Sequence, residues 1–511
     1  MTDNSQNSKR IAKNTILLYF RMILTMLVNL YTSRVILGAL GIDDYGIYNV
    51  VGGIVALFGV ISNSLSTTTQ RFITHALGKN DSNYMNRIFS TSILIHICMS
   101  VLIVILSETI GLWFLKNEMN IPIDREIAAM WVYQCAVVSS VIMIMSVPYN
   151  ATIIAYEKMG TFAAMSLLEV FLKLGIAYTI YISPIDKLIL YSILLVIMQL
   201  CIRFCYTFYC HRHFKETKIH IVKDSKLFKE MGLFSSWSLL GNAAYISYTQ
   251  GLNVLLNVFF TPVVNAARGI AIQVQSIVNQ FVLNFQTAMN PQITKSYASN
   301  NLEYMHNLVF RSARFSFYML YVIALPIFIE CEIILEIWLD VVPDYTMIFL
   351  RLILLTTLIN TIANPLITSV KATGKIKTYE MAVGGTMLTI LPISYVFLKL
   401  EYPPYSVFVI NLCVEIVAQV IRIFITYKLI HFSITKFIKE AILTPLAVAI
   451  AASIIPLLFY YFLEKNIMTF IIVCAVSLVS SCVTIYMFGL NKSERIMIQN
   501  KIIQIKQRII K

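Results

Sequence analysis

The sequence predicts an all-α integral membrane protein with about 14 transmembrane helices, in two parallel six-helix repeat lobes plus two C-terminal helices. Three observations predict this fold. Hydrophobic residues make up 58% of the chain and charged residues only 13%, far from the roughly 25% charged of a soluble domain. Apolar runs long enough to cross a bilayer recur along the chain. The sequence also repeats itself once.

The apolar runs set the number of spans. About 20 residues are needed to cross about 30 Å of hydrocarbon. The runs that reach this length are 14–37, 45–66, 86–115, 127–155, 161–183, 188–210, 228–257, 263–287, 308–330, 347–370, 378–398, 405–430, 441–463 and 467–488. The first and the eighth runs contain arginine and many amides, so their apolar signal is the weakest.

Charge alternates from one gap between the runs to the next. Basic gaps include Lys9, Arg10, Lys13, Arg71, Lys79, Lys158, Lys223, Lys295, Lys375, Lys428 and Lys436, and acidic gaps include Asp43, Asp44, Glu118, Asp124, Glu330, Glu336 and Asp340. A missed span in the middle would break this alternation, and the positive-inside rule places both termini in the cytoplasm. The cytoplasmic loops and the basic tail then explain the formal charge of +14, so we expect no nucleic acid as a partner.

Two separate blocks show the internal repeat. At a shift of 290 − 70 = 220 positions, Ile73, Thr74, Asn80, Tyr84 and Met85 match Ile293, Thr294, Asn300, Tyr304 and Met305. At a shift of 365 − 148 = 217 positions, Pro148, Ala155, Lys158, Thr161 and Phe162 match Pro365, Ala372, Lys375, Thr378 and Tyr379. Matching blocks fall on the same side of the membrane, which predicts a parallel repeat with a substrate site where the halves meet.

The repeat predicts the domain organisation. Residues 1–225 form an N-terminal six-helix lobe, 226–436 a C-terminal six-helix lobe, and 437–488 an extra helix pair. Residues 489–511 form a basic amphipathic cytoplasmic tail, in which isoleucines alternate with lysine and arginine. Such a pattern favours an interfacial helix on anionic membrane lipid.

Ionisable residues inside spans are costly and mark function by default. Here most are cationic: Arg21, Arg34, Lys173, Arg203, Arg268, Arg351 and Arg422, against the acids Glu169 and Glu415. An interior with this bias attracts an anion and repels a cation. The arginines near span ends, Arg34, Arg203, Arg351 and Arg422, can instead snorkel to the headgroups. Glu169 and Lys173 are four residues apart, so they are either a coupling site or a structural ion pair on one helix face.

Three polar stripes at helical spacing predict a cavity lining. They are Arg268, Gln275, Asn279 and Gln286 in the eighth span; Ser238, Asn242, Tyr245, Thr249 and Asn253 in the seventh; and Asn14, Arg21, Thr25, Asn29 and Thr32 in the first. The positions 220 before the first stripe, Tyr48, Val55, Gly59 and Ser66, are much less polar, so the fold itself does not require it. Amide packing between helices is the alternative.

The chemistry of these stripes suits a phosphorylated sugar. Amides, hydroxyls and aromatic rings match sugar hydroxyls and ring faces, and arginine supplies a forked donor for phosphate. We therefore predict substrate binding by the residues Arg21, Arg34, Arg268, Asn29, Asn242, Tyr245, Gln275 and Asn279.

No catalytic or metal signature is present. The sequence contains no Gly-x-x-x-x-Gly-Lys loop, no His-Glu-x-x-His and no Cys-x-x-Cys, and no long exposed loop that would hold a glycosyl-transfer site. We expect a transporter without catalytic residues, metal or bound cofactor.

Several segments together resemble bacterial polysaccharide flippases of the Wzx, or O-antigen translocase, type. They are the run from Arg34 to Tyr48 (RVILGALGIDDYGIY), the run from Gln70 to Ile73, the region of Asn80 and Asp81, and the runs from Pro148 to Thr152 and from Ala155 to Lys158. The likeness extends over essentially the whole chain. Wzx flippases belong to the multidrug/oligosaccharidyl-lipid/polysaccharide exporter superfamily, which also contains MATE multidrug exporters.

The resemblance implies an alternating-access carrier in the bacterial inner membrane that moves an undecaprenyl-pyrophosphate-linked oligosaccharide for O-antigen, capsule or exopolysaccharide synthesis. It implies an ion gradient of H⁺ or Na⁺ as the driving force, and polysaccharide polymerase and chain-length machinery as partners. In such flippases a cationic cavity binds the lipid pyrophosphate, and Arg21, Arg34 and Arg268 lie on the corresponding helices. The alternative function is a MATE-like small-molecule exporter, which would require a buried carboxylate in its cavity.

Overall fold

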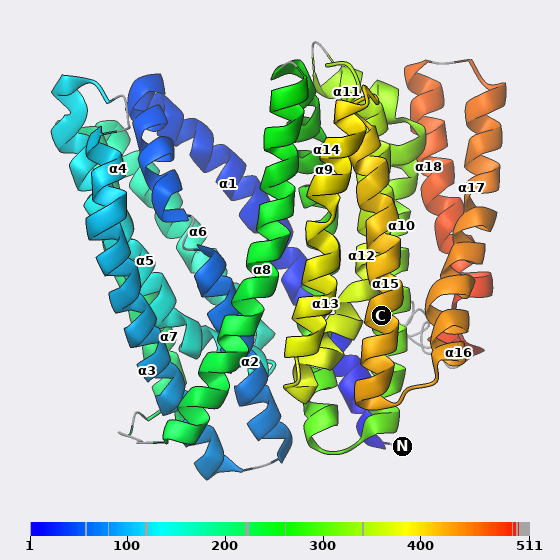
Figure 1. The fold of residues 1–511 in the computed structure, drawn as a ribbon, viewed down its shortest axis with the longest axis horizontal. Coiled ribbons are helices and arrows are strands. Elements are labelled where there is room, and N and C mark those ends of the chain that lie inside the picture. Colours follow the sequence, from blue (N-terminus) through cyan, green and yellow to red (C-terminus); the bar gives the residue numbers. More distant parts are fainter. Residues whose placement is uncertain are drawn as a thin grey trace, which may run out of the picture. The chain divides into compact units, whose positions relative to one another are not determined.

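The computed structural model describes residues 2–56, 59–79, 81–117, 121–218, 220, 224–260, 262–339, 342–464, 466–492, 494–496 and 499. All regular secondary structure in these ranges is helical, and the long helices of each unit run side by side (Figure 1). Lys223, Asp340 and most of the predicted amphipathic tail, 501–511, lie outside the described residues.

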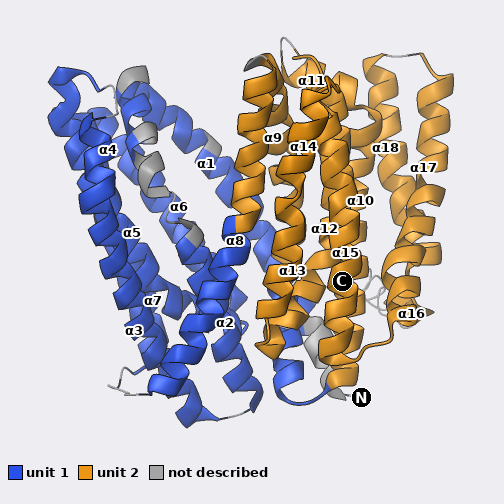
Figure 2. Ribbon diagram, in the orientation of Figure 1, with its two compact units in different colours: residues 1–243, 287–301 blue, residues 244–286, 302–511 orange. Residues whose placement is uncertain are grey.

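The chain divides into two compact units. Unit 1 contains residues 1–243 and 287–301, and unit 2 contains residues 244–286 and 302–511. The boundaries fall inside two long helices, α8 (Ser225–Phe259) and α9 (Pro262–Ala298), so each of these helices supplies residues to both units (Figure 2). The predicted lobes, 1–225 and 226–436, stay a prediction.

Unit 1 is built from seven further helices. They are α1 (Thr2–Ala56), α2 (Gly59–Lys79), α3 (Ser82–Leu106), α4 (Leu112–Asn117), α5 (Glu126–Ala155), α6 (Met159–Ile182) and α7 (Lys187–His213). α5 is central, because it packs against α1, α2, α3, α6 and α7, and α1 also packs along α6. Apolar residues on nearly every face of α5 permit this.

The predicted break between the first two spans corresponds to Gly41. α1 is interrupted there by a non-helical residue with φ of 79° and ψ of 174°. A side chain with a Cβ rarely adopts this backbone conformation, so glycine is the residue that lets the chain change direction. The two halves of α1 are therefore separate helical segments.

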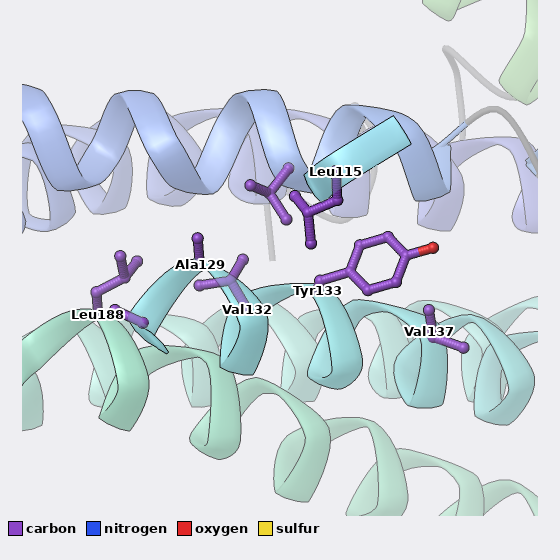
Figure 3. Close-up of a cluster of buried hydrophobic side chains, with 8 residues drawn as sticks. Leu115, Ala129, Val132, Tyr133, Val137 and Leu188 are labelled. Atoms are coloured by element: carbon purple, nitrogen blue, oxygen red, sulfur yellow. The ribbon is translucent and has the colours of Figure 1, made fainter. Parts of the chain in front are cut away.

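A buried cluster joins α1, α4, α5 and α7 (Figure 3). Leu115, Val132 and Leu188 pack together in it, and the Tyr133 hydroxyl donates to the Ser107 carbonyl at 2.7 Å. Ser107 begins a π-helical turn that connects α3 to α4. The Ser107 carbonyl also accepts from the Leu112 amide of this turn. The tyrosine therefore adds a second donor, and its own buried hydroxyl gains a partner inside the apolar cluster.

An ion cluster connects α1, α5 and α7. Arg125 donates to Asp44 from Nε at 2.8 Å and to Asp186 from Nη1 at 2.6 Å. Asp186 also caps α7 by accepting from the backbone amides of Leu188 and Ile189. Partial burial alone would raise the pKa of Asp186, but the Arg125 guanidinium and the helix amides hold this pKa below its usual value.

Unit 2 contains the remaining helices. They are α10 (Leu302–Ile329), α11 (Cys331–Trp338), α12 (Thr346–Thr373), α13 (Lys377–Leu388), α14 (Ile390–Lys399), α15 (Ser406–Ile430), α16 (Ile434–Phe437), α17 (Thr444–Phe462) and α18 (Ile467–Thr484). α12 packs between α10 and α15, and α17 packs against α18 and α10. α10 is also joined to the segment after α18, because Arg311 and Arg314 both pair with Glu494.

The helices confirm most of the predicted spans. Eleven helical stretches in the described part of the chain are long and apolar enough to cross a membrane. The other three predicted spans, 45–66, 228–257 and 263–287, coincide with the end of α1 together with α2, with α8 and with α9, whose polar residues lower their hydropathy. The count of fourteen therefore stays a prediction.

Candidate functional site

A polar cavity of about 60 Å³ lies inside unit 2. Its walls come from α8, α9, α12 and α15. Its polar lining residues are Tyr245, Tyr248, Thr249, Arg268, Gln275, Thr356, Asn360 and Asn411. Since one water occupies about 30 Å³, the cavity has room for a small polar group such as a phosphoryl group rather than for a whole glycan.

Among the described residues, Arg268 is the single charged residue that lines this cavity. Its side chain comes from α9 and the residue is 8% exposed. The Arg268 Nη2 donates to the Thr249 carbonyl of α8 at 2.6 Å, while its buried Nε has no hydrogen-bond partner among the described residues. A buried guanidinium with a spare donor is costly unless an anion completes its hydrogen bonds.

The amides around Arg268 are held by neighbouring helices. Gln275, two turns further along α9, donates to the Thr357 hydroxyl of α12 at 2.8 Å. The Oδ1 of Asn411, on α15, is buried without a partner in the described part of the chain. The cavity therefore offers a cation, an acceptor and several hydroxyls, and none of the described residues in its lining is a carboxylate.

The predicted membrane-embedded acid of unit 2, Glu415, forms an ion pair. Glu415 of α15 pairs with Arg422 two turns later on the same helix, with Oε1 and Nη1 2.5 Å apart. Arg422 also donates from Nε to the Tyr379 hydroxyl at 3.2 Å. Arg422 is 5% exposed, so the interpretation that it snorkels to the headgroups is wrong.

A second cavity, of about 470 Å³, lies inside unit 1. Its lining includes Tyr48, Cys135, Ala136, Ser139, Ser140, Met143, Glu169, Lys173, Ser192 and Gln199. Several of these occupy the repeat positions of the first cavity. Subtraction gives 268 − 220 = 48, 353 − 217 = 136, 356 − 217 = 139 and 360 − 217 = 143, and Arg268, Ile353, Thr356 and Asn360 all line the cavity of unit 2. The two halves therefore carry equivalent cavities with different chemistry.

Glu169 and Lys173 both line the unit 1 cavity but form no ion pair in the described structure. The Gln199 amide of α7 approaches the Glu169 carboxylate at 3.5 Å. The two side chains therefore make no direct contact of the kind that a structural ion pair requires. The assignment of Glu169 and Lys173 to ion coupling stays a prediction.

The other predicted site residues lie elsewhere. Arg21 donates to Ser166 at 3.4 Å and lies over the Phe162 ring of α6 at 4.6 Å. Asn29 and Arg34 are exposed on α1. Asn242 donates to Ser64 at 2.8 Å. These residues belong to unit 1, so a single cavity that joins all three polar stripes stays a prediction.

The eighth-span stripe has two parts with different roles. Arg268 and Gln275 line the cavity, whereas Asn279 is partly buried outside its lining. Gln286 donates to Ser316 at 3.1 Å and accepts from Asn364 at 3.1 Å. Amide packing between helices is the alternative for the whole stripe. The structure shows such packing at the C-terminal end of the stripe.

Two further arginines have local partners. Arg203 lies over the Tyr149 ring at 5.1 Å, and Arg351 donates from Nε to the Phe328 carbonyl at 3.2 Å. Both are partly exposed, which allows a headgroup contact beside these interactions.

Sequence reasoning missed the lining residues of α12 and α15. Thr356, Asn360 and Asn364 recur every four residues along α12, which is the same signal that identified the α9 stripe. Asn411, Glu415, Gln419 and Arg422 likewise follow one another at spacings of four, four and three along α15, so the same pattern indicates Asn411.

The chain has the fold of MATE-type transporters. A multidrug resistance MATE family transporter of the MOP superfamily, in an outward-facing conformation, matches with a TM-score of 0.69 and 13% identity, over 83% of this chain and 96% of that one. A MATE protein in the straight conformation matches with a TM-score of 0.71 and 12% identity, over 85% and 97%.

A third solved structure is informative for its pocket. A MOP superfamily transporter from Pyrococcus furiosus, described as having a reverse polarity of the binding pocket that suggests a different function, matches with a TM-score of 0.68 and 12% identity, over 83% of this chain and 96% of that one. No family model and no curated protein matches the sequence.

Proposed function

We propose that this protein is a flippase for an undecaprenyl-pyrophosphate-linked oligosaccharide, a repeat unit of O-antigen, capsule or exopolysaccharide, and that it works by alternating access. The observation that carries the proposal is the unit 2 cavity, where a buried arginine with a spare donor has no carboxylate beside it among the described lining residues. A fold shared with MATE and MOP superfamily transporters supports a membrane carrier.

The sign of the charge selects the substrate class. A phosphoryl group supplies the acceptors that Arg268 lacks, and the neighbouring amides and tyrosines suit the first sugar. A lipophilic cation would instead meet like-charge repulsion in a low-dielectric space, which costs about 4 kcal/mol for two unit charges 4 Å apart at an effective dielectric constant of 20. The cavity therefore favours a pyrophosphate-linked lipid over a cationic drug.

The unit 1 cavity supplies the coupling site of this proposal. Glu169 is a deep carboxylate that lines a polar cavity and has no ion-pair partner among the described residues. Such a group can take up H⁺ or Na⁺ from one side of the membrane and release it on the other. Lys173 in the same cavity would favour the charged carboxylate and so tune that exchange.

The proposal includes a location and partners. It places the protein in the bacterial inner membrane with fourteen spans, both termini in the cytoplasm, and a basic tail on anionic lipid. Polysaccharide polymerase and chain-length machinery would take up the product. Cysteine labelling of Asp43→Cys from outside and of Lys375→Cys from inside tests the topology, and labelling of either site from the opposite face would contradict it.

Reconstitution tests the function. In liposomes with an imposed ion gradient, the protein should move a pyrophosphate-linked glycolipid between leaflets and leave ethidium untransported. Protein-free liposomes give the background for both substrates. Ethidium transport without glycolipid movement would remove the flippase proposal.

A MATE-like small-molecule exporter is the alternative function. One observation favours it: Glu169 gives the unit 1 cavity the buried carboxylate that a cation exporter requires. The same liposomes separate the two functions, because an exporter would move ethidium in a Glu169-dependent manner and ignore the glycolipid.

A further inference from the structure

A fully buried carboxylate lies in the turn between α5 and α6 of unit 1. The Glu157 side chain is 0% exposed and forms ion pairs with Arg10, from Oε2 to Nε at 2.8 Å, and with Lys295, from Oε1 to Nζ at 2.8 Å. Gln292 donates from Nε2 to Oε2 at 2.7 Å, and Asn14 donates to the Glu157 carbonyl at 3.4 Å. Donors from α1 and α9 thus occupy both carboxylate oxygens. We call these five residues the Glu157 cluster.

The backbone of Glu157 is in a conformation that favours glycine. Its φ is 57°, and the Lys158 amide donates to the Ile153 carbonyl at 3.0 Å, as in helix ends where glycine commonly occupies the left-handed position. The repeat shows the contrast, because 374 − 157 = 217 and Gly374, with φ of 80°, ends α12. The first half thus has a glutamate where the second half has glycine. Since glutamate carries a backbone cost there, its side-chain contacts must offset that cost.

The cluster fixes one end of α9. Residues 287–301 belong to unit 1, whereas the rest of α9 belongs to unit 2. An apolar cluster of Leu18, Ile154, Met159 and Ala288 adds to the attachment of this end. Gly78 of α2 also packs closely against it, since a Cβ at Gly78 would come within 2.6 Å of the Ala298 Cβ.

We propose that the Glu157 cluster is a latch that fastens the C-terminal end of α9 to α1 and to the α5–α6 turn, and that it opens in each transport cycle. By the sequence repeat, α9 belongs to the second half, and α1 and the α5–α6 turn belong to the first. Lys158 and Lys295 lie in basic gaps, so the latch is on the predicted cytoplasmic side. The role in a cycle rests on the proposed carrier function.

The negative charge of Glu157 keeps the latch closed. One carboxylate pairs with two cations, so its loss removes the negative charge between Arg10 and Lys295, and like-charge repulsion then favours separation. Removal of one cation should restore part of the closed state. This gives the latch a signature that a simple packing contact lacks.

Chemical labelling in the reconstituted full-length protein, without substrate, tests the latch. Ser296 is a small residue of α9, 6% exposed, and Ser296→Cys serves as the reporter, read by mass spectrometry of its own peptide after treatment with an impermeant maleimide. Glu157→Gln should accelerate labelling about tenfold or more, the effect of losing a hydrogen-bonded charge pair. Adding Lys295→Met to Glu157→Gln should slow the labelling again.

Two more variants complete the test. Glu157→Gly removes the carboxylate and places glycine, which adopts a positive φ readily, as Gly374 does at the equivalent repeat position. This variant should therefore accelerate labelling even if Glu157→Gln folds poorly. Glu401 also has a positive φ, 61°, but is exposed, so Glu401→Gln is the matched control and should label at the wild-type rate. Labelling at the wild-type rate in both Glu157 variants would overturn the latch. If the Glu157 variants label faster but the wild-type protein does not move glycolipid, the proposed function alone would be overturned.

Discussion

The two halves of the chain carry cavities at equivalent repeat positions, and the cavities differ in charge. In unit 2 the position is Arg268, and no described residue of the lining is a carboxylate. In unit 1 the position is Tyr48, and the lining contains Glu169 and Lys173. The unit 2 lining thus carries one cation, whereas the unit 1 lining carries one acid and one base. In the proposed function, the unit 2 cavity is the anion site and the unit 1 cavity is the ion-coupling site.

The largest expected effect is at Arg268. Arg268→Gln should abolish nearly all glycolipid transport, because the cavity then lacks a positive charge, and Arg268→Lys should lose much of it, because lysine cannot form a forked contact with phosphate. Initial rates in liposomes measure both. Protein levels should stay near normal, and full transport by Arg268→Gln would mean that the two cavities do not differ as proposed.

The next effect is at Glu169. Glu169→Gln should remove gradient-driven accumulation, because an amide cannot exchange a proton or hold a cation, while glycolipid binding is retained. Transport with and without an imposed gradient gives the measurement. If Glu169→Gln reduces glycolipid binding as strongly as Arg268→Gln does, the division of roles is wrong.

An exchange between equivalent walls sharpens the comparison. Asn360 lines the unit 2 cavity, and Met143 lines the unit 1 cavity at the equivalent repeat position. Asn360→Met therefore gives the unit 2 cavity the residue found in the unit 1 cavity. Loss of one neutral hydrogen bond, about 1 kcal/mol, should lower glycolipid transport about fivefold. The converse variant, Met143→Asn, is the control and should leave the affinity for glycolipid unchanged.

The smallest effect on transport is expected at Gln286. This side chain joins Ser316 and Asn364 outside the cavity, and Gln286→Leu leaves the Asn364 amide without its acceptor, which costs about 1–3 kcal/mol. Thermal unfolding in detergent should therefore move to lower temperature. Transport per folded molecule should stay near wild type, and a loss as large as that of Asn360→Met would extend the site along α9.

Much of the helical fold could be predicted because its signals are local. Hydropathy and loop charge identify spans such as 308–330 and 405–430, which coincide with α10 and α15, and the repeat offsets of 217 and 220 also relate the two cavities. Polar helices are harder: α8 and α9 carry amides on one face, so hydropathy alone understates them.

The site was less predictable, since pairing between distant residues has no local signature. The seven-residue spacing of Glu415 and Arg422 places them on one helix face, yet burial with Tyr379 depends on α13. Glu157 reads as an ordinary loop residue, and only the fold brings Arg10 and Lys295 to it. By contrast, the stripe of Arg268 lies along one helix, so the sequence alone displays it, and Arg268 lines the unit 2 cavity.

Binding of inorganic pyrophosphate to the purified protein tests the central claim most directly, because it requires neither transport nor a known sugar. Titration calorimetry of the wild type, Arg268→Gln and Glu169→Gln compares the two cavities under identical conditions. We expect the wild type and Glu169→Gln to bind with similar affinity and Arg268→Gln to bind at least about tenfold more weakly, the equivalent of about 1.4 kcal/mol. Equal affinity in the wild type and Arg268→Gln, or loss of binding in Glu169→Gln alone, would contradict the assignment of the anion site to unit 2.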